Sequence, residues 1–520
     1  MSRSVIPFAR YPGLSPLFLD FLRGSTELYP DPPTVDAGAQ RGRELLGTPS
    51  RVPAGSWRCR GPRARAAAEA LSAGRSVAAV AGHQVGLFTG PLYTLTKAFD
   101  TQRVARELSE RGAAAAPVFW ALTDDHDLEE VGRTAWPGPE GPEVLVVDGA
   151  DRGNRSPVGR LPVPERAGEL LTAFRAAAKA PDADETVAAF ARRYATGRPY
   201  GEAFIETLLD LVEPEPLLVL DPEDESLRAP MAEFFTAAVE RRERLVESVR
   251  GGVARLERLG KPVPVPYRED VFPFFLIEGG ERRRVADPVE ALRRVRAGSA
   301  RPSTDVLTRP VLKSFLIPTA ATVLGPAEIA YHAQSIPLFE VFGLKPPVLL
   351  PRSHLVLVGP AERRLIEALG IARDDLLSGN LAPDAAPVEQ AESVGAIAKS
   401  LVASLAALEP ALKELDPALS SALETTRQKA TYPLEQLRER IRKAAERRTT
   451  TTQNRQKRLE TMIRPNGTPA ERLYPPLLPM LTHGRGVLDT IRQAAAGSLA
   501  GAAIVEIGAP EGGGGEDHAR

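Results

Sequence analysis

The first clear structural unit in the hydrophobic pattern of the chain begins at Val77. The run VAAVAG at 77–82 is short and apolar and ends in glycine, which predicts a buried strand. Apolar residues then recur near helical spacing up to a terminal glycine, so we expect a helix over about 91–111. The apolar run at 116–125 predicts a second strand, which ends in acidic residues. This order of strand, helix and strand indicates a parallel sheet with a right-handed crossover.

The same alternation recurs farther along the chain. We expect a strand at 215–222, followed by an amphipathic helix around 226–250. Two antiparallel strands follow, joined at Gly279 and Gly280, and PPVLLPR at 346–352 predicts one more short strand. The predicted fold class is therefore α/β, with a doubly wound, Rossmann-type core.

From about 389 to 463 the composition changes to Ala, Leu, Glu, Lys and Arg, with almost no aromatic residues or glycines. Leucines recur every three or four residues, which predicts two long helices joined near 410–417 or at Pro433, because proline interrupts helical hydrogen bonding. An antiparallel coiled-coil arm is the simplest arrangement. Such an arm suits dimerisation, and a helical pair packed on its own core fits the pattern equally well.

These patterns divide the chain into a core with insertions, a helical arm and a C-terminal segment that we expect to pack back on the core. The stretch 30–66, rich in Pro, Gly and Arg, predicts an extended connection or a loose helix. About the last 10 residues are glycine-rich and polar, and we expect them to be disordered. The expected boundaries are 1–385 for the core, with insertions around 150–215 and 250–310, then 386–465 for the arm and 466–520 for the C-terminal segment.

Charge and cysteine content exclude several classes of protein. The chain has 66 Lys and Arg against 67 Asp and Glu, a net charge of −1, which argues against nucleic-acid or membrane-surface partners. The single cysteine, Cys59, excludes an intramolecular disulfide and any metal cluster built on several cysteines. The N-terminus has no signal-peptide pattern, and we expect no stretch of about 20 apolar residues able to span a bilayer. A soluble, cytoplasmic protein is therefore expected.

The strongest candidate chemistry is the acidic string TDDHDLEE at 123–130, directly after the predicted strand at 116–125. Ligands of open α/β sheets bind beyond the carboxyl ends of the strands, where this string would lie. Its side chains could hold a metal ion, act as a general base or bind an amine. Alternatively, they are the acids of a helix's first turn, favoured by the helix dipole. The candidates are Asp124, Asp125, His126, Asp127 and Glu129.

A second candidate is the glycine-containing turn at 81–93, between the first strand and its helix. Glycines there allow tight turning, and a helix N-terminus can receive an anion. The turn matches neither GxGxxG nor a Walker A loop, so its spacing identifies no nucleotide. The substrate-binding candidates in this turn are His83, Gln84, Thr89, Gly90 and Tyr93.

A third candidate is the segment 313–334, in which Gly325 and Pro326 predict the start of a helix. Polar residues on one face of that helix either line a pocket or are solvated. Arginines on both sides of the segment are candidate carboxylate clamps, because a guanidinium donates two parallel hydrogen bonds to a carboxylate. The substrate-binding candidates here are Arg309, Gly325, Glu328, Tyr331, Gln334 and Arg352, with His332 as a further polar residue of the helix.

Five strings occur in order over most of the chain: AGHQVGLFTGPLYTLTK, PVFWALTDDHDLEE, FLIPTAATVLGPAEIAYHAQ, PVLLPR and RPNGTPAERLYP. Together they resemble the cysteine-adding enzyme (cysteine ligase) family of bacillithiol biosynthesis, from the N-terminal segment to about residue 505. The chain departs from the family pattern at His83, where a Gln-Gln type pair is expected, and at Asp124, where a Glu is expected. The shorter Asp side chain reduces the reach of that carboxylate by one methylene.

The resemblance implies a nucleotidyltransferase-like Rossmann core with connecting-peptide insertions and a coiled-coil arm that forms a homodimer. It implies a ligase that joins the carboxyl group of L-cysteine to the amine of glucosaminyl-malate, with ATP as the candidate activator and no metal. In that reaction His126 or a flanking carboxylate would take the proton of the amine. Asp125 and Asp127 would also bind the cysteine ammonium, and Arg309 or Arg352 would hold the malate carboxylates.

Two other classes of function fit the residues alone. A metal-dependent hydrolase would use Asp125, His126 and Asp127 as ligands that activate a water molecule. A non-enzymatic scaffold would act through the coiled-coil arm and leave the acidic string without a role.

Overall fold

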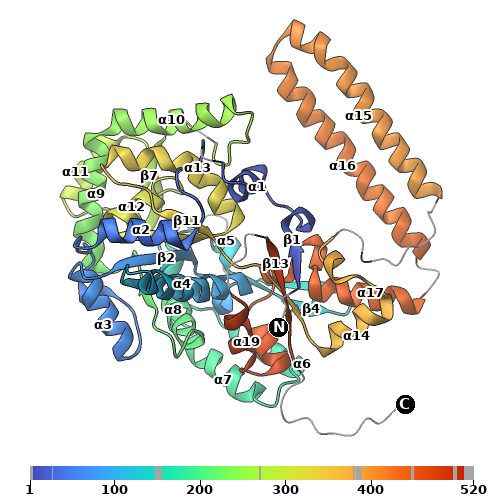
Figure 1. The fold of residues 1–520 in the computed structure, drawn as a ribbon, viewed down its shortest axis with the longest axis horizontal. Coiled ribbons are helices and arrows are strands. Elements are labelled where there is room, and N and C mark those ends of the chain that lie inside the picture. The colour runs from blue at the N-terminus through green and yellow to red at the C-terminus, as the bar shows by residue number, and fades with distance from the viewer. Residues whose placement is uncertain are drawn as a thin grey trace.

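The computed structural model describes residues 4–25, 27–146, 155–266, 268, 271–378, 381, 389–446, 450–495 and 500–508. Its described part is a mixed α/β core from which a long two-helix arm projects (Figure 1). The α/β class and the coiled-coil arm are therefore confirmed. The expectation for the last residues of the chain lies outside the described residues.

The core is built around a five-stranded parallel sheet, which positions the site. Its strands stand in the order β11-β10-β2-β3-β6, and every neighbouring pair is parallel. The chain runs outward from β2 to β6 on one side and from β10 to β11 on the other, so the order reverses between β2 and β10. The strands are β2 (Val77–Gln84), β3 (Ala115–Leu122), β6 (Leu218–Leu220), β10 (Thr319–Leu324) and β11 (Val348–Pro351).

Both faces of this sheet are covered, as the continuous apolar strands predict. Residues 77, 79 and 81 of β2 pack into one hydrophobic cluster, and residues 78 and 80 pack into another on the opposite face. The helices of the first cluster are α2 (Val35–Leu45), α4 (Leu92–Glu110), α6 (Arg166–Ala177), α7 (Ala183–Arg193), α8 (Tyr200–Leu211), α18 (Leu477–His483) and α19 (Val487–Ala494). Those of the second are α3 (Gly61–Ser72), α9 (Arg228–Glu240), α10 (Arg242–Arg258), α11 (Pro288–Arg296), α12 (Arg309–Leu316) and α13 (Pro326–Val341).

Smaller sheets complete the core. The hairpin at Gly279 and Gly280 is confirmed: β7 pairs antiparallel with both β8 and β9. The C-terminal strand β13 lies between β1 and β12, so the end of the described chain packs on the core. The remaining elements here are β1 (Val5–Pro7), β4 (Arg133–Gly138), β5 (Gly141–Val146), α5 (Leu128–Val131), β7 (Phe272–Glu278), β8 (Glu281–Val285), β9 (Arg301–Thr304), β12 (Leu355–Val358), β13 (Gly501–Glu506), α1 (Pro16–Leu22) and α14 (Pro360–Leu369).

Two local predictions were wrong. Residues 30–66 contain the regular helix α2, whose glycines pack closely: a Cβ at Gly42 would lie 2.8 Å from the Ala113 Cβ. The glycines that suggested a loose segment instead let this helix approach the sheet. The single helix expected over 226–250 is two helices, α9 and α10, which meet at Arg241.

The arm consists of α15 (Glu389–Leu415) and α16 (Ala418–Glu446), which lie side by side (Figure 1). The turn falls at the first of the two predicted positions, whereas Pro433 lies inside α16 and Pro410 inside α15. A further helix, α17 (Thr450–Ile463), returns to the core. Contrary to expectation, Ala391–Leu415 is one stretch long and apolar enough to cross a membrane by length and composition alone, which is weak evidence for a membrane span.

Candidate functional site

A cavity of about 1360 Å³ lies at the carboxyl ends of the parallel strands. It is lined from the end of β2, the turn after β3 and the end of β10, where the strand order reverses. Ligands of open α/β sheets bind at such a reversal. Helices α12 and α13 and the β7–β8 hairpin supply the remaining walls.

Most of the sequence-predicted residues meet in this cavity. Residues from three separate segments of the chain, at 83–93, 125–129 and 309–352, line it together. They are His83, Gln84, Tyr93, Asp125, His126, Asp127, Glu129, Arg309, Gly325, Glu328, Tyr331 and Arg352. Thr89, Gly90, Asp124, His332 and Gln334 do not line it.

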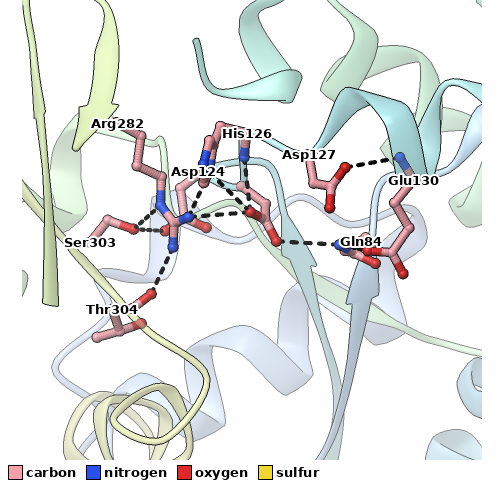
Figure 2. A network of polar contacts seen from close by, with 9 residues as sticks. Gln84, Asp124, His126, Asp127, Glu130, Arg282, Ser303 and Thr304 are labelled. Carbon is pink, nitrogen blue, oxygen red and sulfur yellow. Dashed lines mark hydrogen bonds and ion pairs between the residues drawn. The ribbon is translucent and has the colours of Figure 1, made fainter. Parts of the chain in front are cut away.

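The acidic string is held by an arginine from the hairpin (Figure 2). Arg282 Nη1 donates to Asp125 Oδ1 at 3.2 Å and lies 2.9 Å from His126 Nδ1. The guanidinium also stacks over the Phe275 ring, 3.7 Å from its centroid. Burial alone would raise the pKa of Asp125, but contacts with His126 and the charges of Arg309 and Arg282 outweigh it and hold the pKa well below its usual range. Asp125 is therefore an anion at neutral pH.

The same contact assigns the proton of His126. An arginine N–H can only donate, so His126 Nδ1 accepts from Arg282 and the proton of the neutral ring lies on Nε2. In this arrangement His126 offers a hydrogen-bond donor to the cavity rather than a free basic nitrogen.

Asp124 joins the same hydrogen-bond network through Ser303, which contacts Arg282 (Figure 2). It is 3% exposed, and Ser303 Oγ donates to its Oδ2 at 2.6 Å. Ser303 in turn accepts from Arg282 Nε at 3.0 Å, and Arg282 Nη2 donates to the Thr304 carbonyl at 2.9 Å. Asp124 therefore fixes the position of Arg282, and its carboxylate has no access to a ligand in the cavity.

The acidic turn also forms hydrogen bonds to Gln84, at the end of β2. Gln84 Nε2 donates to Glu130 Oε2 at 2.8 Å and contacts Asp125 Oδ2 at 3.3 Å. Asp127 caps the short helix α5 by accepting from the Glu130 backbone N–H at 3.0 Å. The helix-capping interpretation thus applies to Asp127, while Asp125 faces the cavity.

The floor of the cavity holds an ion pair between the buried Lys97 and the half-buried Glu328. Lys97 Nζ lies 2.5 Å from Glu328 Oε2 and 3.1 Å from the Gly82 carbonyl, and Gly325 N–H donates to the same carboxylate oxygen at 2.7 Å. Burial alone would raise the pKa of Glu328, but Lys97 holds it below its usual range. Beside this pair, His83 Nε2 lies 2.8 Å from the Tyr93 hydroxyl.

Histidine 83 is neutral at physiological pH. Burial, and then the charge of Lys97, lower its pKa to about 4. Burial raises the pKa of Tyr93 to about 12, so the pair contributes uncharged hydrogen-bonding groups to the wall.

The two candidate carboxylate clamps differ. Arg352 is 2% exposed and is held by Glu471 at 2.9 Å and by the Ser353 carbonyl at 2.7 Å. Arg309 lines the cavity, and within the described part of the chain its buried Nε has no hydrogen-bond partner. Arg309 is therefore the arginine with donors left for a ligand.

The turn at 89–90 faces the protein interior. The Thr89 N–H donates to the Tyr194 hydroxyl at 3.0 Å, and Thr89 is fully buried with a φ of 73°. At the start of α4, the Leu92 N–H donates to the Tyr474 carbonyl at 2.8 Å. These donors are occupied, so Thr89 and Gly90 shape the wall without presenting a phosphate site.

Gln334 likewise supports the cavity. Its side chain donates to the Val265 carbonyl and accepts from the Val265 N–H, both at 2.9 Å. Val265 lines the cavity, so Gln334 positions a wall residue. His332 is also buried, with its Nδ1 2.8 Å from the Glu328 carbonyl.

Sequence reasoning missed several charged residues of the cavity, among them Lys97, Arg282 and Lys313. Lys97 and Lys313 fall inside amphipathic helices and Arg282 in a charged hairpin, where a solvated position is the usual interpretation. Among the described residues, no group of three or more His, Cys, Asp and Glu is arranged to hold a metal ion. The ligand set required by the hydrolase hypothesis is therefore missing from that part of the chain.

Comparison with known proteins covers almost the whole chain. Residues 52–353 match the N-terminal Rossmann-like domain model of the bacillithiol biosynthesis protein BshC, and residues 356–506 match its C-terminal coiled-coil domain model. Three relatives carry the name "Putative cysteine ligase BshC". The relative from Solibacter usitatus is 29% identical, covering 79% of this chain and 80% of its own. Those from Salinibacter ruber and Koribacter versatilis are each 27% identical, covering 83% and 94% of this chain and 83% and 97% of their own.

Proposed function

The chain belongs to the BshC family of bacillithiol biosynthesis and is a ligase; from this premise we propose that it joins the carboxyl group of L-cysteine to the amine of glucosaminyl-malate. The product is an amide, and the reaction takes place in the cytoplasm. The observation that carries this proposal is the presence of opposite charges in one cavity, which ionised Asp125 and Arg309 both line.

The two substrates match these charges. The cysteine ammonium pairs with Asp125, close to the Nε2 donor of His126, and the malate carboxylates pair with Arg309. The polar wall of Gln84, His83 and Tyr93 suits the sugar hydroxyls.

Amide formation from a carboxylate and an ammonium in water requires activation. ATP is the proposed activator, and Arg155 and Arg284 are the cavity residues with the charge to hold its phosphates. The chain's own residues hold and orient the amine and the acyl group in this proposal.

The direct test is an assay of the purified full chain with L-cysteine, glucosaminyl-malate and ATP, followed by mass spectrometry. We expect an amide product and the release of phosphate or pyrophosphate from ATP. R309M is expected to raise KM for glucosaminyl-malate by about 10-fold to 100-fold, the usual effect of losing a charged hydrogen bond. The matched control is K345M, which removes an exposed lysine paired with Glu44, and it should behave as wild type.

In cells, deletion of the gene should remove bacillithiol and cause glucosaminyl-malate to accumulate. Unchanged thiol pools in a cell without a second such enzyme, or a purified protein that makes no amide, would refute the proposal. We also propose that the active form is a homodimer joined through α15 and α16, because apolar side chains on both helices are exposed in the single chain.

A further inference from the structure

Lys313 occupies the cavity floor beneath the end of β2. It lies on α12 one turn after Arg309, so both side chains project from one face of the helix into the cavity. A Cβ at Gly82 would lie only 2.9 Å from Lys313 Nζ, so glycine makes room for the ammonium under the strand. The other neighbour is Trp120, whose ring centroid lies 5.7 Å from Nζ.

The two floor lysines differ in their partners. Lys97 is neutralised by Glu328 at 2.5 Å and by the Gly82 carbonyl. For Lys313, the described residues provide no hydrogen bond or ion pair to Nζ, although its side chain is half-buried. Like charges at i and i+4 destabilise a helix. Placing Arg309 and Lys313 one turn apart therefore costs free energy of folding, and the packing of the two side chains gives no reason for it.

The charged groups that act on Lys313 come from four parts of the chain. Arg309 lies on its own helix, Glu328 on α13, Lys97 on α4 and Asp124 after β3. Burial, opposed in part by Glu328 and reinforced by Arg309 and Lys97, lowers the pKa of Lys313 to about 7. A substantial fraction of this lysine is therefore a neutral amine at neutral pH.

We propose that Lys313 is the general base that removes a proton from the sugar ammonium before it attacks the activated cysteine. This assignment rests on the proposed function and adds to it the proton acceptor. The ammonium gives one proton to the lone pair of Lys313 Nζ, which becomes an ammonium, and the freed amine attacks the acyl carbon with its electron pair. The new C–N bond replaces the bond from that carbon to the phosphate oxygen donated by ATP. The phosphate group leaves with the electrons of that bond, and the second proton of the nitrogen passes to it. The proton returns to water after the product leaves.

Other side chains of the cavity are less suited to this task. His126 Nδ1 is engaged by Arg282 and its Nε2 carries the ring proton. Asp125 is a weak base because its carboxylate is stabilised by its neighbours. His83 is also a weak base, and Lys97 Nζ is already engaged by Glu328 at 2.5 Å and by the Gly82 carbonyl. Of these five groups, Lys313 is the one that lies in the cavity with a lone pair that no neighbouring group engages.

The first experiment needs no substrate. Competitive acetylation of the full-length protein with trace acetic anhydride, followed by peptide mass spectrometry, reports the neutral fraction of Lys313 across about pH 5 to 10. We expect half-maximal labelling of Lys313 near pH 7. Half-maximal labelling near the ordinary lysine value of about 10.4 would overturn the proposal.

The second experiment separates a base from a fixed positive charge. K313M and K313R are both expected to lower kcat/KM by about 10²-fold or more, since arginine keeps the charge but stays protonated. The acid limb of the wild-type kcat/KM profile should disappear in both variants, and small primary amines should restore activity to K313A. Wild-type activity in K313R would show that only the charge matters and would overturn the proposal.

Failure of the two proposals can be told apart. A wild-type enzyme that makes no amide from glucosaminyl-malate refutes the proposed function and, with it, this role of Lys313. An active wild-type enzyme whose Lys313 is labelled only at high pH refutes the role of Lys313 alone. K345M, at an exposed lysine, is the control for both experiments.

Discussion

Arg282 Nη1 lies 2.9 Å from His126 Nδ1, and this contact decides what the histidine of the acidic string can do. The guanidinium comes from the β7–β8 hairpin, far along the chain, and is only 3% exposed. Because it can only donate, it leaves His126 with its proton on Nε2. The imidazole is thereby oriented as a hydrogen-bond donor toward the cavity.

A histidine that acts as a donor can be replaced by another donor. We expect H126Q, whose side-chain amide can donate from a similar position, to retain kcat/KM within about 10-fold of wild type. H126A loses the hydrogen bond and should fall by about 10-fold to 100-fold, the range for hydrogen bonds to charged groups. Equal loss in H126Q and H126A would instead indicate that His126 accepts a proton. Nitrogen NMR of the labelled protein should independently show the Nε2–H tautomer.

The pair Lys97–Glu328 offers a prediction about stability. E328Q leaves the Lys97 ammonium buried without its counter-ion, and we expect a loss of about 3–5 kcal/mol in the free energy of unfolding. The double variant K97M/E328Q removes both charges and should be less destabilised than the sum of the two single variants. Additive losses in thermal or urea unfolding would show that the two side chains do not interact.

Much of the fold followed from the sequence because the apolar pattern of its strands is strong. The runs that became β2 and β3 are buried on both faces, and glycines bound the intervening turn and helix. Helix α2 was expected only as a loose helix or an extended connection, because its glycines, at 38 and 42, signal close packing that only the assembled sheet makes visible. The arm's two helices were recognised, but the choice between Pro433 and the earlier turn depended on tertiary context.

The cavity was only partly predictable for a related reason. Asp125 and His126 follow a strand, so their position at the sheet edge could be inferred from chain order. Arg282 contacts Asp125 across 157 residues, and nothing in a run of three arginines shows which one turns inward. Thr89 and Gln334 failed to reach the cavity because backbone contacts with distant segments occupy them.

Glu471 predicts how stability depends on pH. It is 2% exposed and contacts Arg352 at 2.9 Å, His354 at 3.2 Å and the Tyr11 hydroxyl at 2.9 Å. Burial alone would raise its pKa, but Arg352 and His354 outweigh it and hold the pKa well below the usual range.

A carboxylate with a lowered folded-state pKa stabilises the fold above the unfolded value of about 4.3, and the contribution is lost as pH falls below it. E471Q should therefore lower Tm at pH 7 and show a weaker further decrease than wild type between about pH 5 and 3. E506Q, at a partly exposed carboxylate paired with Arg363, is the comparison variant and should change Tm far less. Parallel Tm curves for E471Q and wild type would contradict this assignment.

The exposed apolar residues of the arm test the proposed homodimer. Ile397 and Leu408 on α15 are 57% and 50% exposed, and Leu437 on α16 is 45% exposed. Burying such side chains against a second copy would stabilise the dimer by roughly 25 cal/mol per Å² of apolar surface. The triple variant I397K/L408K/L437K should therefore sediment as a monomer while the Tm of the core is retained. V289K removes a similarly exposed residue, 46%, from helix α11 outside the arm and should stay dimeric. A triple variant with the wild-type sedimentation coefficient would show that the arm packs elsewhere and that the dimer, if formed, uses another surface.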